Sequence, residues 1–191
     1  MRSLPTASGP AVPADLQASR FSRFMFSSTL MAPVWLLLRL YLGWTWLSSG
    51  LEKLGDAKWV GAQAGKAVTD FLQGALKKTG GEMPDVPGWY ARLISDVALP
   101  HAGLFSYLVT FGELAVGVAL ILGLLTGVAA FFGLLMNFAY LFAGTLSSNP
   151  LLVFLGILII LAWRAAGWWG LDRVLLPRLW GWGPVQVGET R

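Results

Sequence analysis

The chain has 191 residues, of which 55% are hydrophobic and only 13% are charged, and its mean hydropathy is +0.63. An ordinary soluble domain carries about 25% charged residues, so this composition excludes that class and predicts an integral membrane protein. Cysteine is absent and histidine occurs once, which excludes a disulfide framework, thiolate-bound iron–sulfur clusters and a bis-histidine haem within one chain.

The N-terminal part of the chain divides into a polar tail and an apolar segment. Residues 1–29 are rich in Ser, Ala and Pro, so we expect a flexible cytoplasmic tail. Residues 33–54 are predicted to form the first membrane span. One face of this helix collects small and polar residues, namely Arg39, Gly43, Trp46, Gly50 and Lys53. Such a face favours close packing against other helices.

The connection after the first span is too polar to cross a membrane and too apolar to be disordered. Apolar residues recur every four positions from Trp59 to Leu76, which predicts an amphipathic helix over residues 57–78. A second short interfacial helix is expected over residues 89–97, after a turn-rich segment. Together, residues 57–97 are expected to form an external cap that lies over the mouth of the bundle.

The stretch from residue 105 to residue 150 is long, apolar and interrupted only near Gly127, so it predicts two spans, 101–124 and 126–146. Its one charged residue is Glu113. Reflection of the sequence about Leu125 places Glu113 level with Asn137, the partner that we expect for it. A bare carboxylate in hydrocarbon costs several kcal/mol, so Glu113 needs a partner, water or a ligand, and it is the candidate proton-active residue.

A fourth span is predicted at residues 150–169, followed by a C-terminal tail at residues 177–191. The expected fold is therefore an all-α integral membrane protein. Its domain, residues 30–176, is a four-helix transmembrane bundle with a two-helix amphipathic cap between spans one and two. The tails and the end of span four carry seven basic residues against three acidic ones, whereas the cap is balanced. The positive-inside rule then predicts cytoplasmic termini and a multi-pass protein of the plasma (inner) membrane.

Four segments of the sequence resemble a known family. They are LRLYLGWTWLSSGLEKLGDAKWV, FGELAVGVALILGLLTGVAAFFG, NFAYLFAGTLSSNP and LAWRAAGWWGLDR. In this order and spacing they resemble the DoxX/DoxD family of four-span membrane proteins over about residues 36–176. Some members of that family are assigned as the large subunit of thiosulfate:quinone oxidoreductase.

The resemblance implies one function and leaves a second open. The first is the quinone-linked subunit of an oxidoreductase of the thiosulfate dehydrogenase (quinone) type, with membrane quinone as cofactor. The second is a non-catalytic accessory or anchoring subunit of a larger respiratory or photosynthetic membrane complex. Since the sequence shows no resident electron carrier, the enzyme would need a redox partner subunit or direct oxidation at the quinone.

Two candidate sites follow from these predictions. A quinone-like ligand is expected between the cap and the adjacent halves of spans one and two, near Trp46, Trp59, Phe71, Thr110, Glu113 and Asn137, with His101 as a further polar group. Arg39 and Arg164 fall at the same cytoplasmic level and need an anionic partner. We expect an anionic lipid there, and the alternatives are Glu113, a quinone oxygen or Asp172. The alternative is a closed bundle in which the polar residues form a purely structural cluster and the tryptophans only fill space or anchor the protein at the interface.

The expected partners are the lipid bilayer and either a second protein subunit or further copies of the chain. No metal site and no nucleic-acid partner are predicted.

Overall fold

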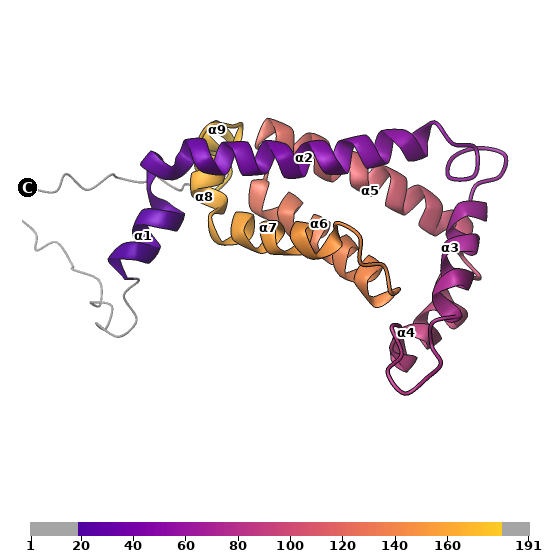
Figure 1. Ribbon diagram of the computed structural model, residues 1–191. Helices are drawn as coiled ribbons and strands as arrows, with labels where there is room; N and C mark the ends of the chain where they lie inside the picture. The colour runs from indigo at the N-terminus through magenta and orange to yellow at the C-terminus, as the bar shows by residue number, and fades with distance from the viewer. Residues whose placement is uncertain (1–18, 181–191) are drawn as a thin grey trace, which may run out of the picture.

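Helices make up the regular structure of the computed structural model, which describes residues 19–180 (Figure 1). In chain order they are α1 (Arg20–Ser27), the 3-10 turn η2 (Thr29–Met31), α2 (Ala32–Leu54), α3 (Lys66–Leu76), α4 (Gly88–Leu93), the π-helical turn η3 (Ile94–Ala98), α5 (Ala102–Leu122), α6 (Thr126–Phe142), α7 (Asn149–Leu161), α8 (Trp163–Ala166) and α9 (Asp172–Trp180). The four longest apolar helices, α2, α5, α6 and α7, pack on one another and form the body of the molecule.

The closest helix pair is α2 with α5, which run antiparallel. A Cβ atom at Gly117 would lie 2.5 Å from the backbone nitrogen of Leu47, and one at Gly50 would lie 2.9 Å from that of Leu114. Only glycine lets two backbones approach this closely, which is the usual role of small residues in membrane helix packing. The small and polar face predicted for residues 33–54 therefore packs against α5, and the backbone contact fixes the register of the two helices.

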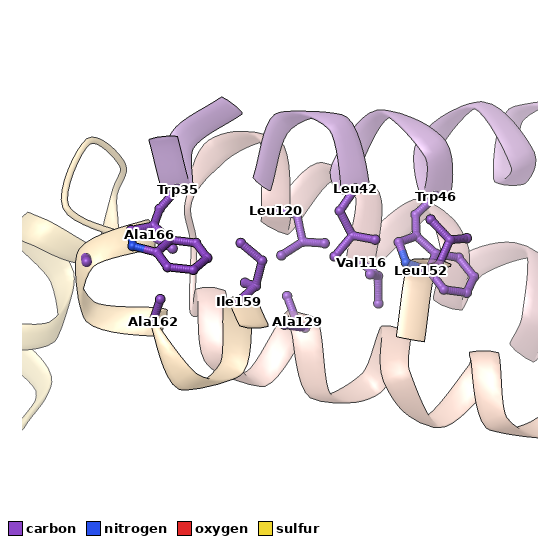
Figure 2. Close-up of a cluster of buried hydrophobic side chains, with 12 residues drawn as sticks. Trp35, Leu42, Trp46, Val116, Leu120, Ala129, Leu152, Ile159, Ala162 and Ala166 are labelled. Atoms are coloured by element: carbon purple, nitrogen blue, oxygen red, sulfur yellow. The ribbon is translucent and has the colours of Figure 1, made fainter. Parts of the chain in front are cut away.

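The hydrophobic core lies between α2, α5, α6, α7 and α8. Figure 2 shows Leu42, Leu120 and Ile159 pointing toward one another from three of these helices. The opposite surfaces of the same helices stay apolar and exposed, for example at Leu37, Trp44, Phe111, Phe131 and Phe154. In the described part of the chain, Thr29–Leu54 and Ala102–Leu122 are long and apolar enough to cross a membrane, and Thr126–Phe142 and Asn149–Leu161 are shorter apolar helices.

The helix after α2 is shorter than the sequence analysis predicts. The prediction covered residues 57–78, but α3 contains only Lys66–Leu76. Gly61 and Gly65 have φ angles of 119° and 96°, in the left-handed region, so the chain before α3 forms turns instead of helix. Gly65 is also held against α5, because a Cβ there would lie 2.7 Å from the backbone nitrogen of Gly103.

The segment α3 to η3 lies across one end of the long helices (Figure 1). We call residues 57–98 the cap. Its second helix, expected at residues 89–97, is α4 continued by η3. The Tyr90 hydroxyl donates to the carbonyl of Ala139 at 2.8 Å and so ties α4 to α6. Burial raises the pKa of this phenol, which favours the neutral, donating form.

The other end of the molecule holds α1, α8 and α9 (Figure 1). Part of the predicted N-terminal tail is helical, since α1 packs near α8 and the Trp35 indole donates to the carbonyl of Met25 at 2.7 Å. The fourth predicted span, 150–169, is broken at Ala162 between α7 and α8, and the third ends at Phe142 instead of residue 146. The rest of the predicted tails, residues 1–18 and 181–191, lies outside the described residues.

Candidate functional site

Glu113 is the central residue of the candidate site. It lies in the middle of α5 and is only 1% exposed. Both of its carboxylate oxygens have partners: Lys53 Nζ lies 2.8 Å from Oε2, and the Tyr140 hydroxyl donates to Oε1 at 2.7 Å. The buried carboxylate is therefore compensated by a cation and a hydroxyl donor, as its depth in an apolar bundle requires.

Lys53 is held in place from three sides. It lies in the last turn of α2, where the helix dipole favours a cation. Its ammonium donates to Ser49 Oγ at 2.8 Å and lies 5.1 Å from the centroid of the Trp59 ring. The Trp59 carbonyl in turn accepts a hydrogen bond of 2.6 Å from Ser106 on α5. The cap residue Trp59 is thus fixed above the charged pair by α5 itself.

Glu113 pairs with Tyr140 and not with Asn137, the partner that the sequence analysis predicts. The predicted hairpin register is close to that observed, since Gly133 faces Val116 with 3.2 Å between its Cβ position and Val116 Cγ1. Side chains on a helix lean toward its N-terminus, so the Glu113 side chain reaches toward the cap and meets α6 about one turn beyond Asn137. The Asn137 side-chain oxygen is buried without a hydrogen-bond partner.

A cavity of about 300 Å³ opens beside this cluster, between the cap, α2 and the connection from α6 to α7. Its apolar walls are Trp46, Trp59, Phe71 and Leu152. Its polar lining consists of Thr45, Ser49, Lys53, Glu113, Tyr140, Thr145, Ser147, Ser148 and Asn149. This volume is at the lower end of the range of ~300–1,000 Å³ for small-molecule sites, and the mixture of aromatic walls with few charges is typical of them.

Four of the six residues proposed from the sequence line this cavity, namely Trp46, Trp59, Phe71 and Glu113. Thr110 does not, because its hydroxyl is buried and donates to the carbonyl of Ser106 at 2.9 Å. Asn137 is buried outside the lining. His101 lies at the start of α5, where Nδ1 is 2.9 Å from the carbonyl oxygen of Val97.

Lys53 belongs to the inward face predicted for the first span, but neither Lys53 nor Tyr140 is among the site residues expected from the sequence. The direction in which Glu113 leans would have identified both, since each lies toward the cap from the level of Glu113. The hydroxyl groups of the α6–α7 connection were also missed. No periodicity marks that connection, and Ser147 adopts a φ of 38°, which is unusual for a residue other than glycine.

The predicted lipid-binding pair Arg39 and Arg164 does not form one surface. Arg39 is 1% exposed, donates from Nη2 to the Trp169 carbonyl at 3.3 Å and interacts electrostatically with Asp172. Its guanidinium packs directly against Gly170, where a larger residue would clash, since a Cβ at Gly170 would lie 2.7 Å from Nη1. Arg164 is exposed and lies over the Trp163 ring, 5.2 Å from its centroid.

The cluster of Lys53, Glu113 and Tyr140 can bind a polar group and transfer a proton. The ammonium and the phenol are donors, and the carboxylate between them accepts from both. A ligand oxygen in the cavity can accept from Lys53 or Tyr140 in place of a Glu113 oxygen, and can take a proton through that hydrogen bond. In the described residues, no group of three or more His, Cys, Asp or Glu side chains is arranged to hold a metal ion.

Comparison with known proteins gives one match. No curated protein and no solved structure matches the chain. The model of the DoxX family matches residues 34–146, which include α2, the cap, α5 and α6 and thus Lys53, Glu113 and Tyr140. Since this match covers more than half of the 191 residues, the chain belongs to the DoxX family of membrane proteins.

Proposed function

We propose that the cavity under the cap binds the headgroup of a membrane quinone and exchanges protons with it, as the quinone-linked subunit of a thiosulfate:quinone oxidoreductase-like complex. The observation that carries this proposal is the cavity of about 300 Å³, in which three aromatic walls enclose the pair of Lys53 and Glu113. A flat ring fits between aromatic side chains, and its carbonyl oxygens need hydrogen-bond donors.

The cavity holds two hydrogen-bond donors from which a ring carbonyl oxygen can accept. Lys53 Nζ and the Tyr140 hydroxyl approach opposite oxygens of Glu113, at 2.8 and 2.7 Å. Reduction of a quinone to a quinol consumes two electrons and two protons. In the proposed function the ammonium and the phenol donate the two protons, and a partner subunit supplies the two electrons. Protons from solvent restore the donors through Lys53, whose side chain is 16% exposed.

The proposal includes a membrane topology with four spans. At about 1.5 Å per residue, the 17 residues of α6 cover about 26 Å, somewhat less than the ~30 Å hydrocarbon core. Helices α7 and α8 together cover a similar length. The end of the molecule that holds α1, α8 and α9 also carries exposed arginines at positions 20, 23, 164, 173 and 178. We therefore infer that this end faces the cytoplasm and that the cap lies outside.

Direct quinone binding tests the function. A short-chain ubiquinone or menaquinone analogue is titrated into the purified protein in detergent, and binding is measured by equilibrium dialysis. We expect saturable binding of about one analogue per chain, which Tyr140→Phe and Glu113→Gln each weaken about tenfold, the effect of one hydrogen bond to a charged group. Tyr107→Phe is the matched control, because Tyr107 is exposed and does not line the cavity.

The result that overturns the proposal is absence of saturable binding, or binding that the cavity variants and the control change equally. Such a result would favour the second function, a non-catalytic subunit that anchors a larger membrane complex. That function predicts that the same variants leave co-purification of the partner subunits unchanged.

A further inference from the structure

A second cavity lies at the opposite end of α6 from the proposed quinone site. Its volume is about 470 Å³, within the usual range for ligand pockets. Its walls come from the first turn of α6, the end of α7, α8 and α9, and they are mostly apolar: Leu125, Val128, Ile160, Trp163 and Leu176. The wall composition suits a hydrocarbon chain.

The polar groups in this cavity are Asp172 and Thr126, and they have different roles. The Asp172 carboxylate accepts from the backbone nitrogens of Leu125 at 2.6 Å and Thr126 at 2.8 Å, and so closes the N-terminus of α6. The Thr126 side chain is 0% exposed, and its hydroxyl has no hydrogen-bond partner although it lines the cavity. A buried hydroxyl without a partner costs about 1–3 kcal/mol, so this position favours a ligand with one hydrogen-bonding oxygen.

The rim of the cavity is basic and aromatic. Trp163 forms part of the wall, and the exposed Arg164 guanidinium lies 5.2 Å from the centroid of its ring. The exposed Arg173 lies in the same way over Trp168, at 4.8 Å. Indole rings prefer the headgroup level of a membrane, and arginines there attract anionic lipids.

We propose that this cavity holds an acyl chain of an anionic phospholipid. The phosphate lies against Arg164 and Arg173, and the ester carbonyl accepts a hydrogen bond from the Thr126 hydroxyl. The apolar walls, the buried hydroxyl and the neighbouring arginines correspond to the chain, ester and phosphate of a phospholipid. The proposed site includes Arg164, one of the two arginines for which an anionic lipid is expected from the sequence. Arg39 is enclosed behind Gly123 and Gly170 and does not line the cavity.

Native mass spectrometry of the detergent-solubilised full chain tests the proposal. Phosphatidylglycerol and phosphatidylcholine with identical acyl chains are added in parallel, and the bound lipid is counted. We expect one phosphatidylglycerol to bind at least about fivefold more tightly than phosphatidylcholine. Arg164→Gln should reduce this preference by about fivefold, the effect of one basic residue near a lipid phosphate.

Two further variants separate the chain and ester contacts from the charge. Thr126→Val keeps the volume and should weaken both lipids alike, because both carry ester carbonyls. Val128→Trp fills the cavity from a half-exposed wall position and should also weaken both. The matched charge control is Arg92→Gln, an exposed arginine in the cap, which should change nothing.

Equal affinity for the two lipids, or an equal effect of Arg164→Gln and Arg92→Gln, would overturn the proposal. Quinone binding is measured on the same variants. It should stay unchanged, since the two cavities share no residue.

Discussion

At the scale of single residues, the ion pair of Lys53 and Glu113 sets the character of the candidate site. Glu113 is enclosed in the bundle, whereas the Lys53 side chain retains 16% exposure toward the cavity. Loss of one partner from a buried pair is far more costly than loss of both, because the remaining charge has no compensation. This asymmetry gives a direct test of whether the pair is formed.

Lys53→Met should destabilise the protein by about 3–5 kcal/mol, because Glu113 then remains as a buried charge without its cation. The double variant Lys53→Met with Glu113→Gln should recover most of that loss, since glutamine still accepts from Tyr140. Thermal unfolding in detergent gives the comparison. Additive losses in the double variant would show that the two side chains do not interact.

Gly123 offers a second prediction. Its φ is 65°, and a Cβ there would overlap Arg39 Nη1. Gly123→Ala should therefore cost more than the ~1–2 kcal/mol of the left-handed conformation alone. Gly74→Ala in α3 is the control of opposite sign, because no atom lies within 4 Å of its Cβ position and it should gain about 0.5–1 kcal/mol. If both variants unfold at the same temperature, the described packing of Arg39 against Gly123 is wrong.

The residue pattern predicted much of the site but not its pairing. Periodicity identified the inward positions of Trp46 and Glu113, because burial on one helix face follows directly from spacing. It could not choose between Asn137 and Tyr140, which differ by less than one turn on the same face. That choice depends on the direction in which the Glu113 side chain leans. Spacing likewise could not show that Arg39 is enclosed by Gly123 and Gly170 at the helix ends.

At the scale of elements, the glycine contact between α2 and α5 is the feature that fixes the bundle. Gly117→Ala would place a methyl group 2.5 Å from the Leu47 backbone nitrogen, so the helices must separate. We expect a loss of about 1–3 kcal/mol from this overpacking and a parallel loss of quinone affinity.

Gly112→Ala is the matched control for this prediction. It lies on the same helix, and its nearest contact is the flexible Met136 sulfur at 3.3 Å. Unfolding midpoints of the two variants, measured side by side, should differ clearly. A Gly112→Ala variant that is as unstable as Gly117→Ala would contradict the register described for α2 and α5.

Element prediction succeeded where apolar runs were long and failed where glycine controls the backbone. The starts of α2, α5 and α6 lie within one residue of the predicted positions. The start of α3 does not, because the apolar residues from Trp59 onward keep a spacing of four while Gly61 and Gly65 leave the helical region. Side-chain periodicity carries no information about such a backbone change.

At the scale of the whole molecule, the two ends differ in charge and in proposed ligand. The cap end carries the cavity with Glu113, and the other end carries the exposed arginines and the larger cavity. The proposed topology assigns these ends to opposite sides of the membrane, so accessibility to a reagent that cannot cross the membrane tests it.

The absence of cysteine makes single-cysteine labelling clean. Met83→Cys, at a position 93% exposed in the cap, should react with a membrane-impermeant maleimide in intact cells. Ser27→Cys, at the exposed end of α1, should react only after permeabilisation. Labelling of both positions in intact cells would disprove cytoplasmic termini.

The contact between α2 and α5 also determines how the first cavity can change its size. Backbones in contact cannot slide without a clash, so Lys53 and Glu113 sit on a fixed frame. The facing wall is the α6–α7 connection, and Lys78 of the cap donates to the Gly144 carbonyl there at 2.7 Å. Cap and connection are thus tethered to each other. For the proposed ligand to enter, we expect them to move together relative to α2 and α5, so that loss of the Lys78 hydrogen bond should change the rate of ligand exchange.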